Sequence, residues 1–581
     1  MSARSVASSS SGVARDFDES SSSTKPRSLR GRGELTKPVS RHSLVPVGDA
    51  GMASAHRQAP CTAPRGAGDA GPGPSGAPTG ARRAIAYGGA WSILAWFAAN
   101  GSGALNTILL VRSMGHPEYG VFVMAASIVA ILNAVASFGL APALVQLSPR
   151  AGAEGARLVL RLALTISSAI AAAVAVLTGI ACLILGVDHF EELAVALAIM
   201  IPIAASAPLA ASLSGYLQSV QQPKLLATAL LAGPLVLSAI VVVLCLSSHP
   251  GASAVSGART AAALVMLASL LLMVRGRGGI GHALLSPATR DAVNVGRVLA
   301  LGGSLVGGAL TAIVLAQLDV LVLGFSRGRE IVALYAPASQ IAVTAMTMAA
   351  TIGTFYLPTI ASTFARGDLA GAGDLYRWAS RWAFVWVAPV IAVMLACPAV
   401  VLTLLFGNAY ASMATPLRIL TGGVLVNVLF GFNGPSVDSL NRIRLIIIRQ
   451  AGALVFNVAA CAALVPAFGA DGAAVATSSS LLFANVVGSY LLHRQTRISP
   501  YNLRLLAVAG ALGVAVGAGL ALDRIRMASP VRIAVVALLA AGLCGAVAYL
   551  ASSAEERRAL RSGVARLATG LTTGLLSHPA V

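Results

Sequence analysis

The sequence has little charge for its length. Of its 581 residues, 11% are Asp, Glu, Lys or Arg, whereas 56% are hydrophobic. Soluble domains carry about 25% charged residues, so this chain lacks the charge to cover a water-facing surface. Most of its surface must face lipid, and the composition predicts an all-α polytopic membrane protein instead of a soluble enzyme.

Several motifs of enzyme chemistry are also missing. The three lysines, Lys25, Lys37 and Lys224, follow Thr or Pro, so none completes the Gly-Lys pair of a phosphate-binding loop. The eight histidines fall in the expected tails, loops and span ends, and the six cysteines form no CxxC pair. We therefore expect no nucleotide hydrolysis by that route, no metal site and no cofactor.

The net charge of +20 does not indicate a nucleic-acid partner, because its distribution follows membrane topology. With a cytoplasmic N-terminus, the inner loops and C-terminal tail hold 21 Lys and Arg, and the outer loops and span ends hold 8. Another 12 lie in the first 84 residues. The positive-inside rule then predicts a multi-pass protein with both termini in the cytoplasm.

Long apolar runs and short polar loops divide the chain into six parts. We expect a disordered basic cytoplasmic tail at 1–84, a six-helix lobe at 85–275, and a cytoplasmic linker at 276–296. A second six-helix lobe would occupy 297–497, two further spans 498–551, and an amphipathic cytoplasmic tail 552–581. Each span approaches the roughly 20 residues needed to cross hydrocarbon, giving about fourteen spans in total.

A weak internal repeat supports the division into lobes. Tyr119 and Pro142 recur 216 residues later as Tyr335 and Pro358, flanking corresponding spans. With six spans each, the halves would share one orientation and meet at a central passage. Coincidence in a low-complexity apolar sequence remains the alternative.

Five segments carry a resemblance to a known family: RSMGHPEYGVF (112–122), FGLAPAL (138–144), LDVLVLG (318–324), LLFGNAY (404–410) and LVPAFGADGAAVAT (464–477). In this order and spacing they resemble the polysaccharide and oligosaccharide flippases of the multidrug, oligosaccharidyl-lipid and polysaccharide exporter superfamily. The resemblance implies a two-lobed carrier of the bacterial inner membrane. It would move undecaprenyl-linked sugar repeat units outward for O-antigen, capsule or exopolysaccharide, with a polymerase and glycosyltransferases as possible partners.

Three rival functions stay open at this stage. The related lipid II flippases resemble this chain but have a central cluster of arginines, and few arginines fall within spans here. Drug–cation antiporters of the same superfamily carry acidic residues deep in their lobes, which the sequence places at no mid-span position. A membrane glycosyltransferase or polymerase would need a larger soluble loop than the roughly twenty residues expected here.

Ionisable residues in spans are expensive in hydrocarbon and indicate function. We expect Arg449, with Arg442 and Arg444, to attract the substrate pyrophosphate, because guanidinium groups match phosphate geometry. Their alternative use is to reach lipid headgroups along their apolar stems. Arg112, which ends the first span, is a further candidate for substrate binding. Asp319, placed at the outer end of span 298–320, is a candidate for ion coupling, a helix cap, or a structural partner of Arg112.

Amide side chains in spans could bind sugar hydroxyls, although amides more often join membrane helices to one another. The candidates for substrate binding are Asn106, Asn133, Gln340 and Asn433. The wider set of polar cavity candidates adds Gln146, Gln317, Asn427, Asn457 and Asn485.

Overall fold

The computed structural model describes residues 100–148, 152–187, 190–220, 222–247, 250–275, 295–440, 442–499, 503–522, 528–554 and 556–558. Within them, all regular structure is helical. The expected tail at 1–84, nearly all of the linker at 276–296 and most of the tail at 552–581 lie outside the described residues.

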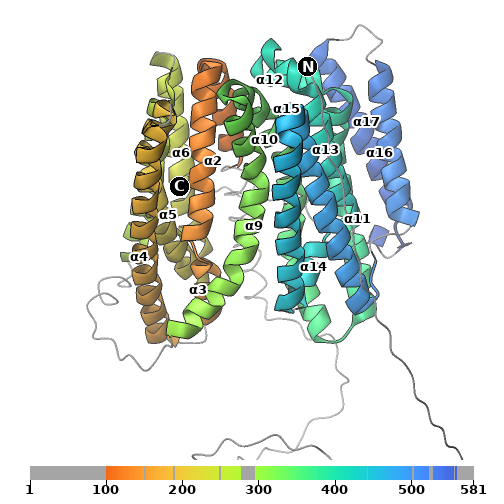
Figure 1. The fold of residues 1–581 in the computed structure, drawn as a ribbon. Coiled ribbons are helices and arrows are strands. Elements are labelled where there is room, and N and C mark those ends of the chain that lie inside the picture. The colour runs from red at the N-terminus through yellow and green to blue at the C-terminus, as the bar shows by residue number, and fades with distance from the viewer. Residues whose placement is uncertain are drawn as a thin grey trace, which may run out of the picture. The chain divides into compact units, whose positions relative to one another are not determined.

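The first group of helices comprises α2 (His116–Ala136), α3 (Leu140–Leu147), α4 (Gly152–Val187), α5 (Glu191–Ser219), α6 (Pro223–Ser247) and α7 (Ala252–Arg275). The second comprises α9 (Val295–Arg327), α10 (Arg329–Ala365), α11 (Leu369–Ala396), α12 (Pro398–Phe406), η3 (Asn408–Met413), α13 (Ala414–Leu429), α14 (Asn433–Ser439) and α15 (Ile443–Thr496). Two last helices follow, α16 (Leu503–Ala521) and α17 (Ser529–Leu550). The long helices run between two ends, called here the α12 face and the α14 face after the short helices that lie there (Figure 1).

Twelve helices in the described residues are long and apolar enough to cross a membrane. The chain is therefore an all-helical polytopic membrane protein, as its composition predicts. The count of about fourteen differs for two reasons. Most of the expected first span, 85–111, lies before the described residues, and the expected spans 443–465 and 470–492 are joined in α15.

Helix α15 reverses direction at Gly469, whose φ of 59° and ψ of −129° are not helical. Asn457 before this break donates a hydrogen bond from Nδ2 to Oγ of Ser480 after it, at 3.0 Å. The rings of Phe456 and Phe483 stack with centroids 4.8 Å apart. The two parts of α15 therefore lie side by side and run in opposite directions, as two spans would.

Helices are interrupted within spans at glycines and not at the prolines that predict kinks. The sequence predicts kinks at five prolines, and all of them lie inside continuous helices: Pro202 and Pro208 in α5, Pro234 in α6, Pro337 in α10 and Pro389 in α11. The chain instead breaks between α13 and α14 at Gly431, where φ is 66°. A residue without Cβ adopts this left-handed conformation at little steric cost.

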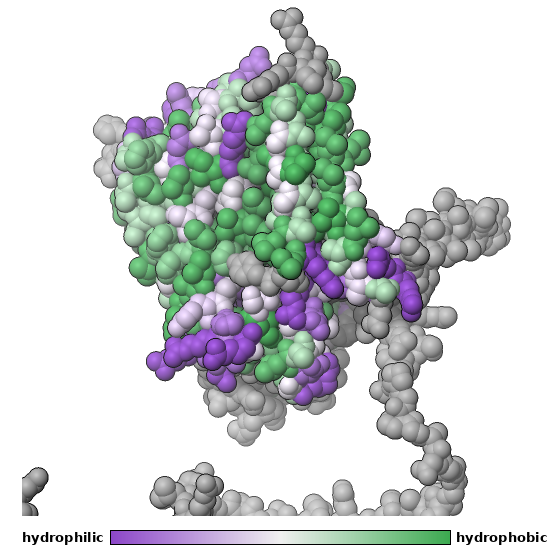
Figure 2. Space-filling model, turned by 90° about the vertical axis from the view of Figure 1, so that its right-hand side faces the viewer, coloured by the Kyte–Doolittle hydropathy of each residue, from purple (hydrophilic) through white to green (hydrophobic). Residues whose placement is uncertain are grey.

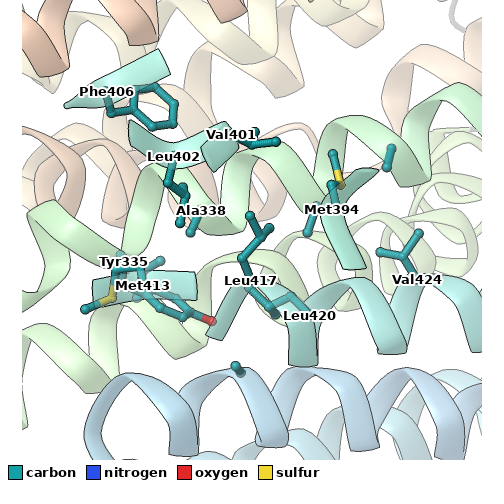
Figure 3. Packing of buried hydrophobic residues seen from close by; sticks show 14 of the residues in the cluster. Tyr335, Ala338, Met394, Val401, Leu402, Phe406, Met413, Leu417, Leu420 and Val424 are labelled. Carbon is teal, nitrogen blue, oxygen red and sulfur yellow. The ribbon is translucent and has the colours of Figure 1, made fainter. Parts of the chain in front are cut away.

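Exposed apolar side chains cover the sides of the helices. Leu183 is 74% exposed and Leu246 83% exposed, which suits contact with lipid tails and not with water. Figure 2 shows hydrophobic residues over most of one side and hydrophilic residues near its two ends, with the larger groups at the lower end. The buried interior is also apolar, and Figure 3 shows part of it, with Tyr335, Leu417 and Met394 among its members.

Helices from the two groups are in close contact at the α12 face. Arg329 at the start of α10 forms an ion pair with Glu192 at the start of α5. The rings of Phe190 and Phe325 meet edge to face, with centroids 5.7 Å apart. Helix α2 crosses the start of α10 at Gly120, where a Cβ atom would lie 2.8 Å from the carbonyl carbon of Arg329.

The residues after α17 are tied to α11. The backbone N–H of Ser553 donates to a carboxylate oxygen of Glu556 at 3.0 Å, and the N–H of Glu556 donates to Oγ of Ser553 at 3.2 Å. This reciprocal pair is a capping box, which starts a helix. The Glu556 carboxylate also accepts a hydrogen bond from the buried guanidinium of Arg381 at 2.9 Å, so it fixes the end of α17 to α11.

Candidate functional site

A cavity of about 620 Å³ lies among the helices of the second group. Side chains of α9, α10, α13, α14 and α15 form its wall, with one contribution from α11. Its size falls in the usual range of small-molecule sites. The sequence predicts a passage between the two expected lobes, whereas every residue that lines this cavity belongs to 297–497.

Most of the wall is apolar, and its polar groups form three sets. One contains Asp319, one contains Arg449, and the third is a chain of asparagines. A largely apolar pocket with a few polar groups at fixed positions is the usual form of a ligand site.

Asp319 is buried in the wall with 1% exposure. Its carboxylate accepts hydrogen bonds from the Tyr335 hydroxyl at 2.7 Å and from the Thr477 hydroxyl at 3.0 Å, and the Val320 N–H donates to it at 2.8 Å. Three donors thus replace the water that this carboxylate lost on burial, as a buried ionisable group requires. Tyr335 comes from α10 and Thr477 from α15, so Asp319 also joins three helices.

The position of Asp319 corrects two expectations. Helix α9 continues to Arg327, so Asp319 lies eight residues before its end instead of at the outer end of a span. It does not pair with Arg112 either. The Arg112 guanidinium donates to the backbone carbonyls of Leu404 and Leu405 at the end of α12. The expected Arg112–Asp319 pair is therefore wrong.

Arg449 lines the cavity near the α14 face, and its side chain is 17% exposed. Its Nη2 lies 2.9 Å from Oδ1 of Asp438 on α14. Its Nε is buried with no hydrogen-bond partner in the described residues. Two glycines give the side chain room, because a Cβ at Gly434 would lie 3.3 Å from Nη1 and one at Gly488 would lie 3.2 Å from Cδ.

The asparagines form a hydrogen-bonded chain along the wall. Nδ2 of Asn433 donates to the carbonyl oxygen of Asn485 at 2.9 Å, to its Oδ1 at 3.1 Å and to Oγ of Ser489 at 3.0 Å. Nδ2 of Asn485 in turn donates to Oδ1 of Asn427 at 2.9 Å. These bonds join α13, α14 and α15 and hold the amides in fixed orientations beside the cavity.

The structure brings only some of the predicted residues together. Arg449, Asn433 and Asp319 line the cavity, as do Asn427 and Asn485 from the wider set. Arg442 is exposed and donates to the Gln495 side chain, and Arg444 is exposed.

Four further candidates are not among the residues lining this cavity: Arg112, Asn106, Asn133 and Gln340. Gln340 is exposed, and Asn106 is buried with its side-chain oxygen unpaired in the described residues. The side chain of Gln146 lies outside what the structure describes.

The partners of the two charged groups are not evident in the sequence. Tyr335 and Thr477 are ordinary span residues in composition, and Asp438 stands out only as a residue just past an expected span. One signal was available for Tyr335, because α9 and α10 are joined by a tight turn at Gly328. Residues at similar distances before and after such a turn lie opposite each other on antiparallel helices.

In the described residues, no group of three or more His, Cys, Asp or Glu is arranged to hold a metal ion. The arrangement instead offers a guanidinium with an unused donor, oriented amides and a buried carboxylate. Such a site can bind an anionic group at one end, hydroxyl groups along its wall, and a small cation at the carboxylate.

Comparisons with protein families and with solved structures also indicate a polytopic membrane protein. Residues 85–364 match the family described as Polysaccharide biosynthesis protein. Among solved structures, the chain resembles the lipid II flippase MurJ in an inward closed conformation, with a TM-score of 0.65 at 14% identity, over 79% of this chain and 98% of that one.

It also resembles an inward-facing multidrug resistance MATE family transporter of the MOP superfamily, with a TM-score of 0.55 at 14% identity, over 68% and 94% of the two chains. A third similar structure is the eukaryotic MATE transporter AtDTX14, with a TM-score of 0.52 at 15% identity, over 72% and 96%. A search of curated proteins finds no match. At these identities the structural likeness concerns the fold.

Proposed function

We propose that the chain is a flippase for undecaprenyl-linked oligosaccharide repeat units, because residues 85–364 match the family described as Polysaccharide biosynthesis protein and the fold resembles that of MOP superfamily transporters. It would act in the bacterial inner membrane, in the assembly of O-antigen, capsule or exopolysaccharide. The α14 face would lie in the cytoplasm with both termini, and the α12 face outside. Glycosyltransferases would supply the lipid-linked glycan, and a polymerase would use it.

The observation that carries this proposal is the placement of Arg449. It lies in the cavity wall with most of its side chain buried, beside amides that suit sugar hydroxyls. An arginine that only anchors the chain to headgroups extends to the surface instead. In this proposal Arg449 binds the substrate pyrophosphate, and the exposed Arg442 and Arg444 attract it towards the cavity by long-range charge.

Asp319 is proposed as the ion-coupling group. It is a buried carboxylate in the cavity wall with hydroxyl donors from two other helices. A cation or proton at this position would change the hydrogen bonds that join α9, α10 and α15, so ion binding would act on helix packing. Energy for transport would come from an ion gradient, the membrane potential or the substrate's own concentration gradient.

The test is a flipping assay in proteoliposomes, with undecaprenyl-pyrophosphate oligosaccharide whose headgroup is detected by an impermeant glycosidase. We expect Arg449→Ala to slow flipping by about tenfold or more, because a hydrogen bond to a charged group contributes about 1.5–3 kcal/mol. Arg449→Lys should retain part of the rate. The matched control is Arg377→Ala, which removes an arginine from an exposed ion pair on α11 and should have no effect.

Unchanged flipping in both Arg449 variants would contradict the proposed anion site. Faster flipping of lipid II than of oligosaccharide-linked lipid by the unaltered protein would assign the chain to peptidoglycan synthesis instead. An Asp319→Asn variant that transports normally under every ion gradient would exclude obligatory coupling through this carboxylate.

A further inference from the structure

The contact between Arg449 and Asp438 has features that would allow a bound anion to replace the Asp438 carboxylate. One Nη2–Oδ1 contact of 2.9 Å joins the two groups. The side chain of Asp438 is 39% exposed, while that of Arg449 is 17% exposed. Nε of Arg449 is buried without a hydrogen-bond partner in the described residues, so the carboxylate does not satisfy all of the guanidinium's five donors.

A diphosphate could make better use of this guanidinium. It offers more acceptor oxygens and more negative charge than a single carboxylate, and it accepts two parallel N–H bonds from one arginine. Because the carboxylate and the diphosphate would use the same donors, they cannot both bind fully at once. The two anions therefore compete.

We propose that Asp438 is a specificity-determining residue that acts as a built-in competitor for the anion site. In the protein without substrate, its carboxylate occupies Arg449. A headgroup carrying a diphosphate displaces it, while a neutral or singly charged headgroup does not offset the loss of the pair. This inference rests on the proposed function of Arg449. It adds that Asp438 sets how much negative charge a headgroup needs in order to bind there.

The surroundings of Asp438 allow this exchange without collapse of the site. Helix α14 has two other polar attachments, from Asn433 to α15 and from the hydroxyl of Ser436 to that of Tyr356 on α10, at 2.6 Å. Both remain when Arg449 turns to a ligand. Gly431, in its left-handed conformation, separates α14 from α13, so a small shift of α14 need not move the whole span.

The exchange also has a consequence for release. After translocation, the Asp438 carboxylate can recapture Arg449 and help the diphosphate to leave. Removing this carboxylate should therefore strengthen anion binding and slow turnover at the same time. A purely structural role predicts the opposite for binding, because a disturbed site binds more weakly.

The experiment uses the full-length protein in lipid nanodiscs and titrates inorganic pyrophosphate at constant ionic strength, with sulfate as the weaker anion. We expect Asp438→Asn to bind pyrophosphate about fivefold more tightly, a modest gain because the carboxylate is partly exposed. Sulfate, which gains the same freed guanidinium, should bind more tightly by a similar factor, so that a weaker anion also reaches measurable occupancy once the carboxylate is removed. Asp438→Ser, a second variant without the carboxylate, should behave in the same way.

Two controls make the result specific. Asp374→Asn removes a carboxylate from the exposed Arg377–Asp374 pair on α11 and should leave pyrophosphate binding unchanged. In the double variant Asp438→Asn/Arg449→Gln, the gain in affinity should disappear, because the freed guanidinium is the source of the gain. In the flipping assay, Asp438→Asn should lower both KM and kcat.

The failure of this inference differs from the failure of the proposed function. If pyrophosphate binding depends on Arg449 but Asp438→Asn and Asp438→Ser bind it no more tightly, the competitor role is overturned and the anion site stands. If Arg449→Gln leaves both pyrophosphate binding and flipping unchanged, the anion site itself is wrong, and the role of Asp438 is overturned with it.

Discussion

Replacing Gly120 by alanine should destabilise the protein through a single contact between two backbones. A Cβ at this position on α2 would lie 2.8 Å from the carbonyl carbon of Arg329 on α10, and closer still to its oxygen. Ordinary contact begins at 3.4 Å, so the carbonyl carbon alone requires the helices to separate by 0.6 Å at this crossing, and the closer oxygen requires more. No side-chain rotation relieves the overlap, because the obstructing atoms belong to the backbone.

The expected magnitude follows from two opposing effects. Overpacking of a well-packed interior costs about 1–3 kcal/mol, and a backbone obstacle places this site at the upper end of that range. Alanine in a helix gains roughly 0.5–1 kcal/mol over glycine. We therefore expect Gly120→Ala to lower the free energy of unfolding by about 2 kcal/mol.

The assay is thermal unfolding in detergent, beside the matched variant Gly179→Ala. Gly179 is a helical glycine of α4, and a Cβ added to it would have no atom within 4 Å, so alanine there should leave stability equal or slightly higher. A second measurement is cross-linking between cysteines placed at Glu192 and Arg329, which should become less efficient in the Gly120→Ala background because the start of α10 moves away from α2 and from α5, which packs on α2. Equal stability of the two alanine variants would refute the close approach of these helices.

Three further outcomes are expected. Gly431→Ala should unfold at a lower temperature, because a Cβ there would lie 2.6 Å from Cβ of Ser380 and the residue has a φ of 66°. The double variant Gly431→Ala/Ser380→Gly should recover only part of the lost thermal stability, since the strain from the positive φ remains. Ser480→Ala should destabilise the protein by about 0.6 kcal/mol in chemical unfolding, because it leaves the buried Asn457 amide without its acceptor. Burial raises the pKa of the Glu556 carboxyl, but hydrogen bonds from the Ser553 N–H and Arg381 outweigh this and lower it below the ordinary value of 4.5. Folding therefore favours the ionised form of Glu556. The difference in stability between the unaltered protein and Glu556→Gln should be constant from pH 7 to about 5 and should shrink as the pH falls below 4.5. A stability difference that does not depend on pH would contradict the ion pair.

The apolar runs of the sequence predict the spans well, because any segment of about 20 apolar residues must satisfy its backbone as a helix in lipid. They do not show how far a helix extends or where its residues lie in depth. For this reason the sequence places Asp319 at the end of a span, although the apolar residues that follow it continue α9 to Arg327.

The chemistry of the site was predictable in part. Arg449, Asn433 and Asp319 stand out because polar groups are rare in spans, and the structure places all three in one cavity wall. Their partners follow from packing between distant segments. Thr477 and Asp319 are 158 residues apart, and no local pattern indicates that the second part of α15 returns to α9.

Because α15 reverses at a single glycine without a loop, its two parts have little freedom to move independently. Arg449 belongs to the first part and Thr477, the partner of Asp319, to the second. The guanidinium end and the carboxylate end of the cavity are thus carried on one stiff hairpin. A displacement that begins at the proposed anion site would tilt the whole hairpin and strain the Thr477–Asp319 hydrogen bond. Occupancy of the proposed anion site and occupancy of the proposed ion site would then be mechanically connected.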